Sequence, residues 1–269
     1  MKKILLILTA AALALAVSAA AAEKKAEKTD AAEVQKEGFA TALNAGLTMT
    51  DGNSETLAAN VGLATEGEKE ELGSVIAGAV FNYGENTVKT ETTDEATGET
   101  VVAESDEKTI ENAKAYANVK KTLTPRTFAY LDGSVLYDDI ALIDYRATLG
   151  PGLGAYLVKN DQRTLTLEAG PSYVWEKVDG ASNDYLALRF AERYTCQALK
   201  NAKLVQSLEY MPEAEDFDNY LLVGEIGVEA AMSDRLSLRV VLQDKYDNTP
   251  AAGKERNDLS LIAGLGLQL

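Results

Sequence analysis

The sequence predicts an all-β protein: an antiparallel transmembrane β-barrel of about twelve strands that follows a signal peptide. Three observations predict this fold class: a period of two in the apolar residues, a regular alternation of connection lengths, and no second long apolar run. The period is clearest at 234–247, where leucines and valines from Leu236 to Leu242 alternate with polar residues, and at 257–269. An apolar face opposite a polar one over about ten residues is typical of membrane barrel strands.

The amino terminus has the features of an export signal. Lys2 and Lys3 precede an apolar run over 4–17, and small residues lead to Ala22, so we expect a signal peptide over 1–22. Residues 23–37 form a short polar leader of mainly Ala, Glu and Lys. The barrel is expected over 38–269. Because no later segment has the 18 apolar residues of a membrane helix, an exported membrane protein of this sequence must close a barrel.

We expect twelve strands, an even number that leaves both termini on one side of the membrane. Several strands alternate cleanly; in one of them Leu165 and Leu167 oppose Thr166 and Glu168. The third strand is apolar on both faces, so its sequence does not orient it. The expected ranges of the twelve strands are 39–50, 54–66, 70–83, 108–122, 126–137, 142–158, 162–176, 184–199, 203–211, 218–231, 234–247 and 257–269.

The connections alternate in length. All the even-numbered connections, such as 160–161 and 233–234, are short, as periplasmic turns should be. Apart from the short connections 51–53 and 138–141, the odd-numbered ones are longer and richer in Asp, Glu, Gly and Pro, as surface loops are. A soluble sandwich gives no reason for this parity. The longer connections are 84–107, 177–183, 212–217 and 248–256. Aromatic residues at the surface-loop ends of strands suit an interfacial girdle; they are Tyr137, Trp175, Tyr210 and Tyr220.

Composition excludes several classes of function. The net charge of −16 becomes −18 when Lys2 and Lys3 are removed with the signal peptide, and such an acidic chain is not expected to bind nucleic acid. The chain has no histidine, which removes the usual general base and the usual metal ligand. Cys196 is the only cysteine, so no intramolecular disulfide forms. The carboxylates at 213–218 lack the spacing of a calcium loop. We therefore expect no catalytic residues, no metal and no cofactor.

Charged residues of both signs fall on the inward parity and are the candidate site residues. They either pair across strands and plug the lumen, or line a water-filled pore. On the tenth and eleventh strands, Glu229 is expected near Arg235, and Glu225 near Arg239. An inward row of Gly150, Gly152 and Gly154 either makes room for large charged side chains or relieves sheet curvature, and we favour curvature. The candidate charges are Lys114, Lys120, Asp144, Arg146, Glu168, Arg189, Arg193, Glu225, Glu229, Arg235, Arg239 and Lys245.

Four stretches, in order along the chain, resemble one known family. They are Gly46-Leu47-Thr48-Met49-Thr50-Asp51-Gly52-Asn53-Ser54-Glu55-Thr56, the segment 144–156, Leu167-Glu168-Ala169-Gly170-Pro171-Ser172-Tyr173, and Lys245-Tyr246-Asp247-Asn248-Thr249-Pro250 with Asp258 after it. Together they are similar to the YdiY-like salt-induced outer-membrane proteins, a domain-of-unknown-function family (481). The resemblance implies an outer-membrane barrel and a relation to salt or osmotic stress. It supplies no substrate and no catalytic residue. Outer-membrane barrels commonly end in an aromatic residue, whereas this chain ends in Leu269.

Three functions follow, in order of preference. The first is a passive barrel of the bacterial cell outer membrane, either a narrow channel or an envelope-structural protein with a charged lumen and acidic loops. The second is a surface binding protein that uses loops 84–107 and 248–256. The third, a barrel enzyme, is disfavoured by the missing histidine. The expected partners are outer-membrane lipid and the barrel-assembly machinery, with the solute or ligand unidentified.

Overall fold

The computed structural model is a closed antiparallel barrel, which confirms the predicted fold class. It describes residues 38–50, 55–69, 73–93 and 100–269, and these ranges contain twelve strands joined in sequence order. The expected signal peptide, 1–22, and leader, 23–37, lie outside the described residues. Within those ranges, no helix is long and apolar enough to cross a membrane.

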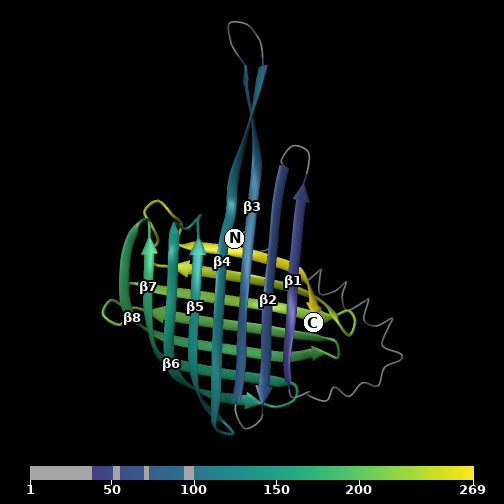
Figure 1. Cartoon of the computed structure of the whole chain (residues 1–269), viewed down its shortest axis with the longest axis vertical. Helices are drawn as coiled ribbons and strands as arrows, with labels where there is room; N and C mark the ends of the chain where they lie inside the picture. Colours follow the sequence, from purple (N-terminus) through teal and green to yellow (C-terminus); the bar gives the residue numbers. More distant parts are fainter. Residues whose placement is uncertain (1–37, 51–54, 70–72, 94–99) are drawn as a thin grey trace.

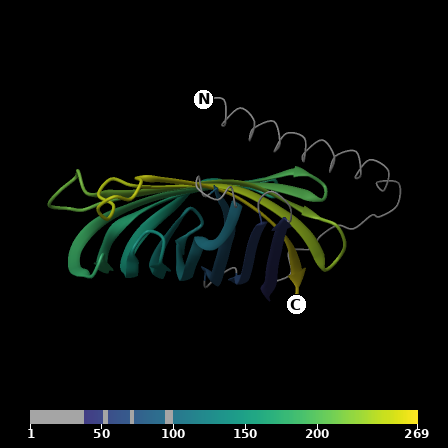
Figure 2. The same ribbon diagram turned by 90° about the horizontal axis from the view of Figure 1, so that it is seen from above.

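Every strand pairs with its neighbours in the chain, and β1 pairs with β12 to close the ring. The ring is flattened, so that from above it has one flat and one curved wall (Figure 2). We call the end where β1 begins and β12 ends the lower end, and the opposite end the upper end. The strands are β1 (Gly38–Thr50), β2 (Glu55–Lys69), β3 (Gly73–Thr93), β4 (Thr100–Thr124), β5 (Thr127–Asp138), β6 (Ile143–Lys159), β7 (Arg163–Val178), β8 (Ala181–Leu199), β9 (Ala202–Pro212), β10 (Tyr220–Ala231), β11 (Leu236–Asp247) and β12 (Asn257–Gln268).

Two of the expected surface loops are wrong. The segment 84–107 is mostly strand, because β3 continues to Thr93 and β4 begins again at Thr100, and this hairpin projects beyond the upper end (Figure 1). The segment 177–183 is reduced to a two-residue turn at Asp179 and Gly180, both with positive φ. In each case strand pairing continues through polar residues, which the period of apolar residues cannot detect.

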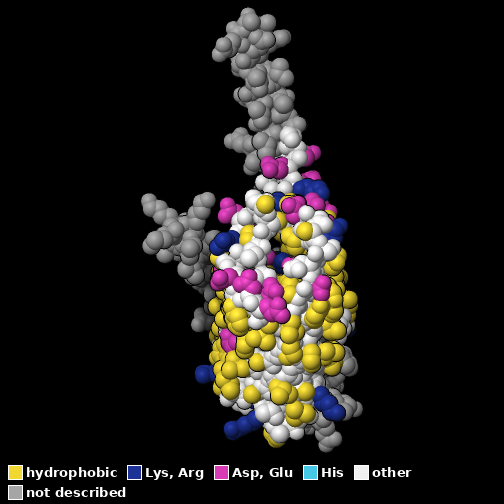
Figure 3. Space-filling model, turned by 90° about the vertical axis from the view of Figure 1, so that its left-hand side faces the viewer, with side chains coloured by type: hydrophobic (Ala, Val, Ile, Leu, Met, Phe, Trp, Pro, Cys, Tyr) yellow, Lys and Arg dark blue, Asp and Glu magenta, His cyan; other side chains and the backbone are white. Residues whose placement is uncertain are grey.

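The outer wall is apolar over its middle and charged at its two ends (Figure 3). The third strand, which its sequence did not orient, places Phe81 outward with its side chain 48 % exposed. Leu265 on β12 and Leu131 on β5 face outward in the same way. Outward leucines and valines of this kind explain the period of two in the sequence.

Aromatic rings gather on the outer wall toward the upper end. Tyr210 contacts both Phe190 and Tyr220, and Tyr220 stacks on Tyr246, with ring centroids 5.6 to 6.5 Å apart. Trp175 on β7 contacts Tyr173 at 4.8 Å. The rings therefore form a ladder that starts at Phe190 on β8 and reaches the upper ends of β9, β10 and β11.

Prolines and glycines bend the wall at β6 and β7. An ideal Cβ at Gly150 would lie 2.2 Å from the carbonyl oxygen of Pro171, and one at Gly170 would lie 2.3 Å from that of Pro151. Only glycine permits so close a backbone approach. The two strands therefore bend together here, which supports curvature as the role of Gly150.

The closing seam between β1 and β12 is short. Its register covers four residue pairs, from Ala42 with Gln268 to Ala45 with Leu265, and the Leu269 N–H donates to the Thr41 carbonyl. By contrast, β1 pairs with β2 from Gly38 to Thr50. Above the seam β1 and β12 diverge (Figure 1).

Candidate functional site

The candidate functional site is the charged interior of the barrel. At mid-depth, five side chains from five strands form what we call the central charge cluster. Its members are Lys120 on β4, Asp132 on β5, Glu168 on β7, Arg189 on β8 and Glu209 on β9. All five occupy the inward parity of their strands, so the period of two places them in one space.

Arg189 is the centre of this cluster. Its Nη1 donates to Glu168 Oε2 at 2.9 Å and its Nε to Glu209 Oε2 at 2.7 Å, with Asp132 Oδ1 3.5 Å from Nε. Glu168 uses its second oxygen, Oε1, to accept from Lys120 Nζ at 2.6 Å. Lys120, Glu168 and Arg189 are each only 8–9 % exposed. Opposite charges are therefore paired where water is largely excluded, which is the condition under which buried charges are tolerated.

Two aromatic rings lie beneath the cations of the cluster. Lys120 Nζ is 4.7 Å from the Phe128 ring and the Arg189 guanidinium 5.4 Å from the Tyr130 ring, both within the range of cation–π attraction. Gly152 and Gly154, directly opposite these rings, leave them space, since an ideal Cβ at either would lie 2.3 Å from ring atoms. These two glycines therefore make room for aromatic rings, rather than for the charged side chains considered from the sequence. Within the described part of the chain, Tyr130 Oη has no hydrogen-bond partner with good geometry.

Nearer the upper end, one ion pair crosses the lumen. Arg146 Nε donates to Glu176 Oε2 on the adjacent β7 at 2.6 Å, while its Nη2 donates to Asp247 Oδ2 on β11 at 3.0 Å. Strands β6 and β11 are not neighbours in the barrel, so the second contact connects opposite walls.

An apolar group fills the lumen beside this crossing. Val174 and Ala187 are fully buried, and Tyr185 and Met211 pack with them, with Leu221 against the group. These residues come from β7, β8, β9 and β10. Apolar side chains that fill a lumen exclude water from it, so the upper half of this side of the barrel is closed as a protein core is.

Below the central charge cluster lies the lower charge group: Arg193, Lys203, Glu229 and Arg239. It is more exposed, since Lys203 and Glu229 are 38 % and 36 % exposed at a separation of 3.4 Å. Among the described residues, Arg193 and Arg239 form no ion pair within 4 Å. This end of the lumen is therefore open to water.

The expected pairing between β10 and β11 is wrong. Glu229 lies opposite Arg239, and Glu225 lies opposite Gln243, which donates to it. The observed register is four residues away from the expected one, and Ala231 pairs with Ser237 across the turn at 232–235. Arg235 is consequently in that turn, exposed, and not in the lumen.

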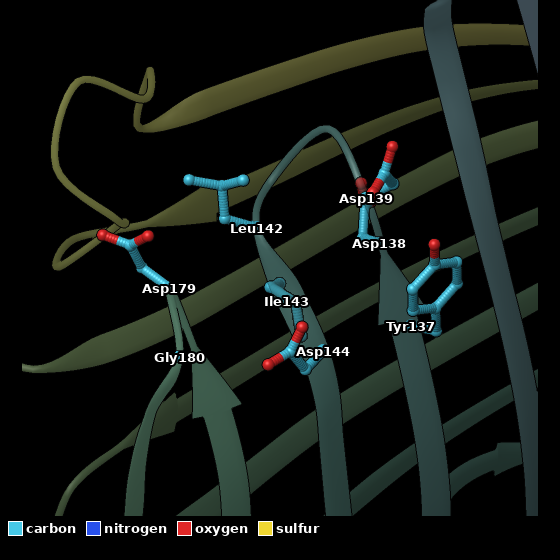
Figure 4. Close-up of a pocket in the computed structure, with 8 residues that line it drawn as sticks. All are labelled: Tyr137, Asp138, Asp139, Leu142, Ile143, Asp144, Asp179 and Gly180. Atoms are coloured by element: carbon cyan, nitrogen blue, oxygen red, sulfur yellow. The ribbon is translucent and has the colours of Figure 1, made fainter.

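The prediction that Asp144 points into the lumen is also wrong. It lies at a bulge near the upper end of β6 and pairs with Lys177 Nζ at 2.9 Å, with both side chains well exposed. It lines a rim pocket of about 340 Å³ with Asp138, Asp139 and Asp179 (Figure 4). Three of these carboxylates already have partners, because Asp139 pairs with Lys108 and Asp138 accepts from the Ala141 N–H. Within the described ranges no group of three potential ligands suits a metal ion.

The remaining predicted charges, Lys114 and Lys245, occupy the inward parity above the central charge cluster. Neither forms an ion pair among the described residues. Lys245 lies directly opposite Asp258 on β12.

Six ion-pair partners of the predicted charges were missed by sequence reasoning: Asp132, Glu176, Lys177, Lys203, Glu209 and Asp247. Asp132, Glu176 and Glu209 lie on inward positions of strands that the sequence located, so a complete parity count would have found them. The Arg146–Asp247 contact joins residues 101 positions apart across the lumen, and no local pattern encodes it.

Comparison with known proteins agrees with the barrel. The family described as "Protein of unknown function, DUF481" matches residues 43–269. Among solved structures, a NanC porin is similar with a TM-score of 0.51 and 9 % identity over 86 % of this chain and 100 % of that one. An outer membrane channel from Pseudomonas putida F1 gives 0.46 and 9 % over 90 % and 100 %. The translocator domain of the autotransporter NalP from Neisseria meningitidis gives 0.45 and 12 % over 97 % of each chain. No curated protein matches.

Proposed function

The chain belongs to the DUF481 family, and from that premise and its closed barrel we propose that it is a passive bacterial outer-membrane barrel, closed at mid-depth. The outward leucines, together with the aromatic ladder from Phe190 to Tyr246, support a membrane location. Because the short connections and both ends of the barrel sequence are expected on the periplasmic side, we place the lower end in the periplasm and the upper end at the cell exterior.

The observation that carries the proposal is the burial of the central charge cluster. An open pore would leave lumen charges in water, whereas Lys120, Glu168 and Arg189 are more than nine-tenths buried and bonded to one another. The cross-lumen contact from Arg146 to Asp247 adds a second closure. Of the two interpretations drawn from the sequence, we therefore prefer the plug to the open pore. An envelope-structural role follows, with conduction only through what space remains.

No chemistry is assigned to the barrel. The absence of histidine and the pairing of the buried carboxylates both support a non-enzymatic role, since a general acid or base needs a free site beside a substrate. A relation to salt or osmotic stress rests on the family resemblance. Expression measured across external salt concentrations tests that relation.

Planar-bilayer recording of the purified barrel tests the plug. We expect no conductance steps from the wild-type protein, and ion-conducting steps when Lys120→Ala, Glu168→Ala and Arg189→Ala are combined. The matched control combines Arg193→Ala, Lys203→Ala and Glu229→Ala. It also removes two positive charges and one negative charge, but from the lower charge group, and should leave the barrel closed. Wide, stable steps from the wild type would contradict the plug, and recovery of the protein as a soluble periplasmic species would contradict the membrane location.

A second candidate function is surface binding, favoured by the projecting β3–β4 hairpin. Its base is ordered by Lys108, which pairs with Glu111 and with Asp139 at 3.2 Å, so that these two carboxylates raise the pKa of Lys108. Together with the 248–256 connection, this hairpin offers a partner an extended surface. Deletion of residues 88–104 should abolish adhesion or ligand capture by cells if binding is the function, and leave barrel assembly intact.

A further inference from the structure

We propose that the outer wall over β4, β5 and β6 holds one anionic phospholipid of the inner leaflet, and this rests on the proposed membrane location. A groove of about 500 Å³ lies on this wall. Its floor is made by small outward residues, chiefly Ala115, Ala117 and Ala147, and its edges by Val119, Leu131 and Leu149. The groove is therefore shallow, strongly apolar and open to the surrounding lipid.

A cation lies directly below this groove. Lys121 follows Val119 on the same outward face of β4, and two residues along a strand are about 7 Å apart. Lys120, between them, points inward to Glu168, so Lys121 must point outward. Its side chain is exposed and makes no ion pair among the described residues. The next residue toward the periplasm that carries charge on this wall is Arg126, exposed in the β4–β5 turn.

Groove and cation together match one class of ligand. An acyl chain buries its surface in the apolar groove, and the phosphate of the same lipid meets Lys121 at the level where headgroups lie. A zwitterionic lipid fills the groove equally well but carries no net charge for Lys121 to attract. A second copy of this chain would instead have to bring an anionic side chain to Lys121 and a ridge of its own into the groove.

The outer wall on the other side of the barrel supplies a control. Leu261 on β12 is outward and 50 % exposed, in an alternating row of leucines with no lysine or arginine on the outward positions of its strand. Lipids beside Leu261 should therefore show no preference for headgroup charge. Lys200, in the β8–β9 turn, is a lower-end cation away from the groove.

Fluorescence quenching by brominated lipids tests the site. The only tryptophan is removed by Trp175→Phe, and a reporter is placed by Leu131→Trp in the groove or by Leu261→Trp outside it. In mixed vesicles we expect brominated phosphatidylglycerol to quench the groove reporter with about five-fold higher affinity than brominated phosphatidylcholine, which corresponds to ~1 kcal/mol for one lysine at an anionic surface. The ratio should be near one at Leu261→Trp. Lys121→Gln should abolish the groove preference, and Lys200→Gln should not.

Each other outcome overturns the proposal in a distinct way. Equal ratios at both reporters, or a groove ratio unchanged by Lys121→Gln, would mean that the groove takes any lipid. A groove reporter that neither lipid quenches, beside a quenched Leu261→Trp, would mean that a second copy of the chain covers this wall. Absence of quenching at both reporters would overturn the membrane location itself, and the lipid site with it.

Discussion

The central charge cluster and the lower charge group place the same kinds of side chain on the same face of one barrel, yet their surroundings differ. Arg189 is 8 % exposed and contacts three carboxylates, whereas Arg193, four residues further along β8, is exposed and forms no ion pair among the described residues. Burial makes the first set mutually dependent, because each charge there needs its partner. The second set remains solvated, so its members contribute little and independently. Parity alone places both sets in the lumen; depth and packing decide which of them closes it.

Removal of the central cation should give the largest effect. Arg189→Ala leaves Glu168, Glu209 and Asp132 without their shared partner, and loss of one member of a buried pair costs about 3–5 kcal/mol. This loss is measured as the change in the free energy of folding, from urea titration of the barrel in lipid vesicles. Arg193→Ala is the control on the same strand and should cost less than about 1 kcal/mol. Equal costs for the two arginines would remove the distinction between the two sets.

Filling the space above Tyr130 should be the next most damaging change. Gly152→Ala places a methyl group 2.3 Å from the Tyr130 ring, and overpacking of this kind costs about 1–3 kcal/mol. The same refolding titration measures it. Tyr130→Ala in the same chain should remove most of the additional loss, since the clash then has no partner. Gly180→Ala is the control for backbone strain: an added Cβ at Gly180 meets no atom within 4 Å, but the positive φ of this residue disfavours a side chain. Any loss at Gly180→Ala therefore measures strain without a steric clash.

Tyr130→Phe should act in the opposite direction. The Tyr130 hydroxyl is buried and has no well-aligned hydrogen bond to any described residue, and a buried unsatisfied polar group costs about 1–3 kcal/mol. Its removal should therefore stabilise the barrel by about 1 kcal/mol in the refolding assay, with the ring still beneath Arg189. Destabilisation instead would show that the hydroxyl contributes a hydrogen bond in the folded protein.

The smallest effect is expected in the lower charge group. Glu229 and Arg239 lie opposite each other on β10 and β11, and an exposed cross-strand pair contributes about 0.2–1 kcal/mol. A double-mutant cycle with Glu229→Gln and Arg239→Gln measures the coupling. The cycle of Glu225→Gln with Arg239→Gln should give none, because Glu225 faces Gln243. High salt should reduce the first coupling, whereas the cost of Arg189→Ala should change little.

Much of the fold could be predicted because a barrel wall has two environments. The alternation at Leu236 to Leu242, where every second residue is apolar, indicates the same faces that the structure shows for β11. Register could not be predicted in the same way, since the observed pairing keeps every side chain on its predicted face while it moves Arg239 from Glu225 to Glu229. The period of two is insensitive to a shift of four residues.

The candidate site was accessible from the sequence only as a set of inward charges. Lys120 and Glu168 lie on β4 and β7, which are not adjacent, so their contact depends on how the flattened ring brings its walls together. The role of Gly152 and Gly154 likewise depends on the rings of Tyr130 and Phe128 opposite them. Contacts of this kind are fixed by the cross-section of the barrel, which no single strand encodes.

The short seam between β1 and β12 gives the ring a preferred place to open. A closed ring must break one of its strand junctions before any strand can leave, and the junction with the fewest backbone hydrogen bonds offers the lowest barrier. Four registered pairs join β1 to β12, whereas β7 and β8 are registered from Arg163 with Cys196 to Val178 with Ala181. Strand loss should therefore start at the two ends of the sequence, far from the β7–β8 junction that carries Glu168 and Arg189.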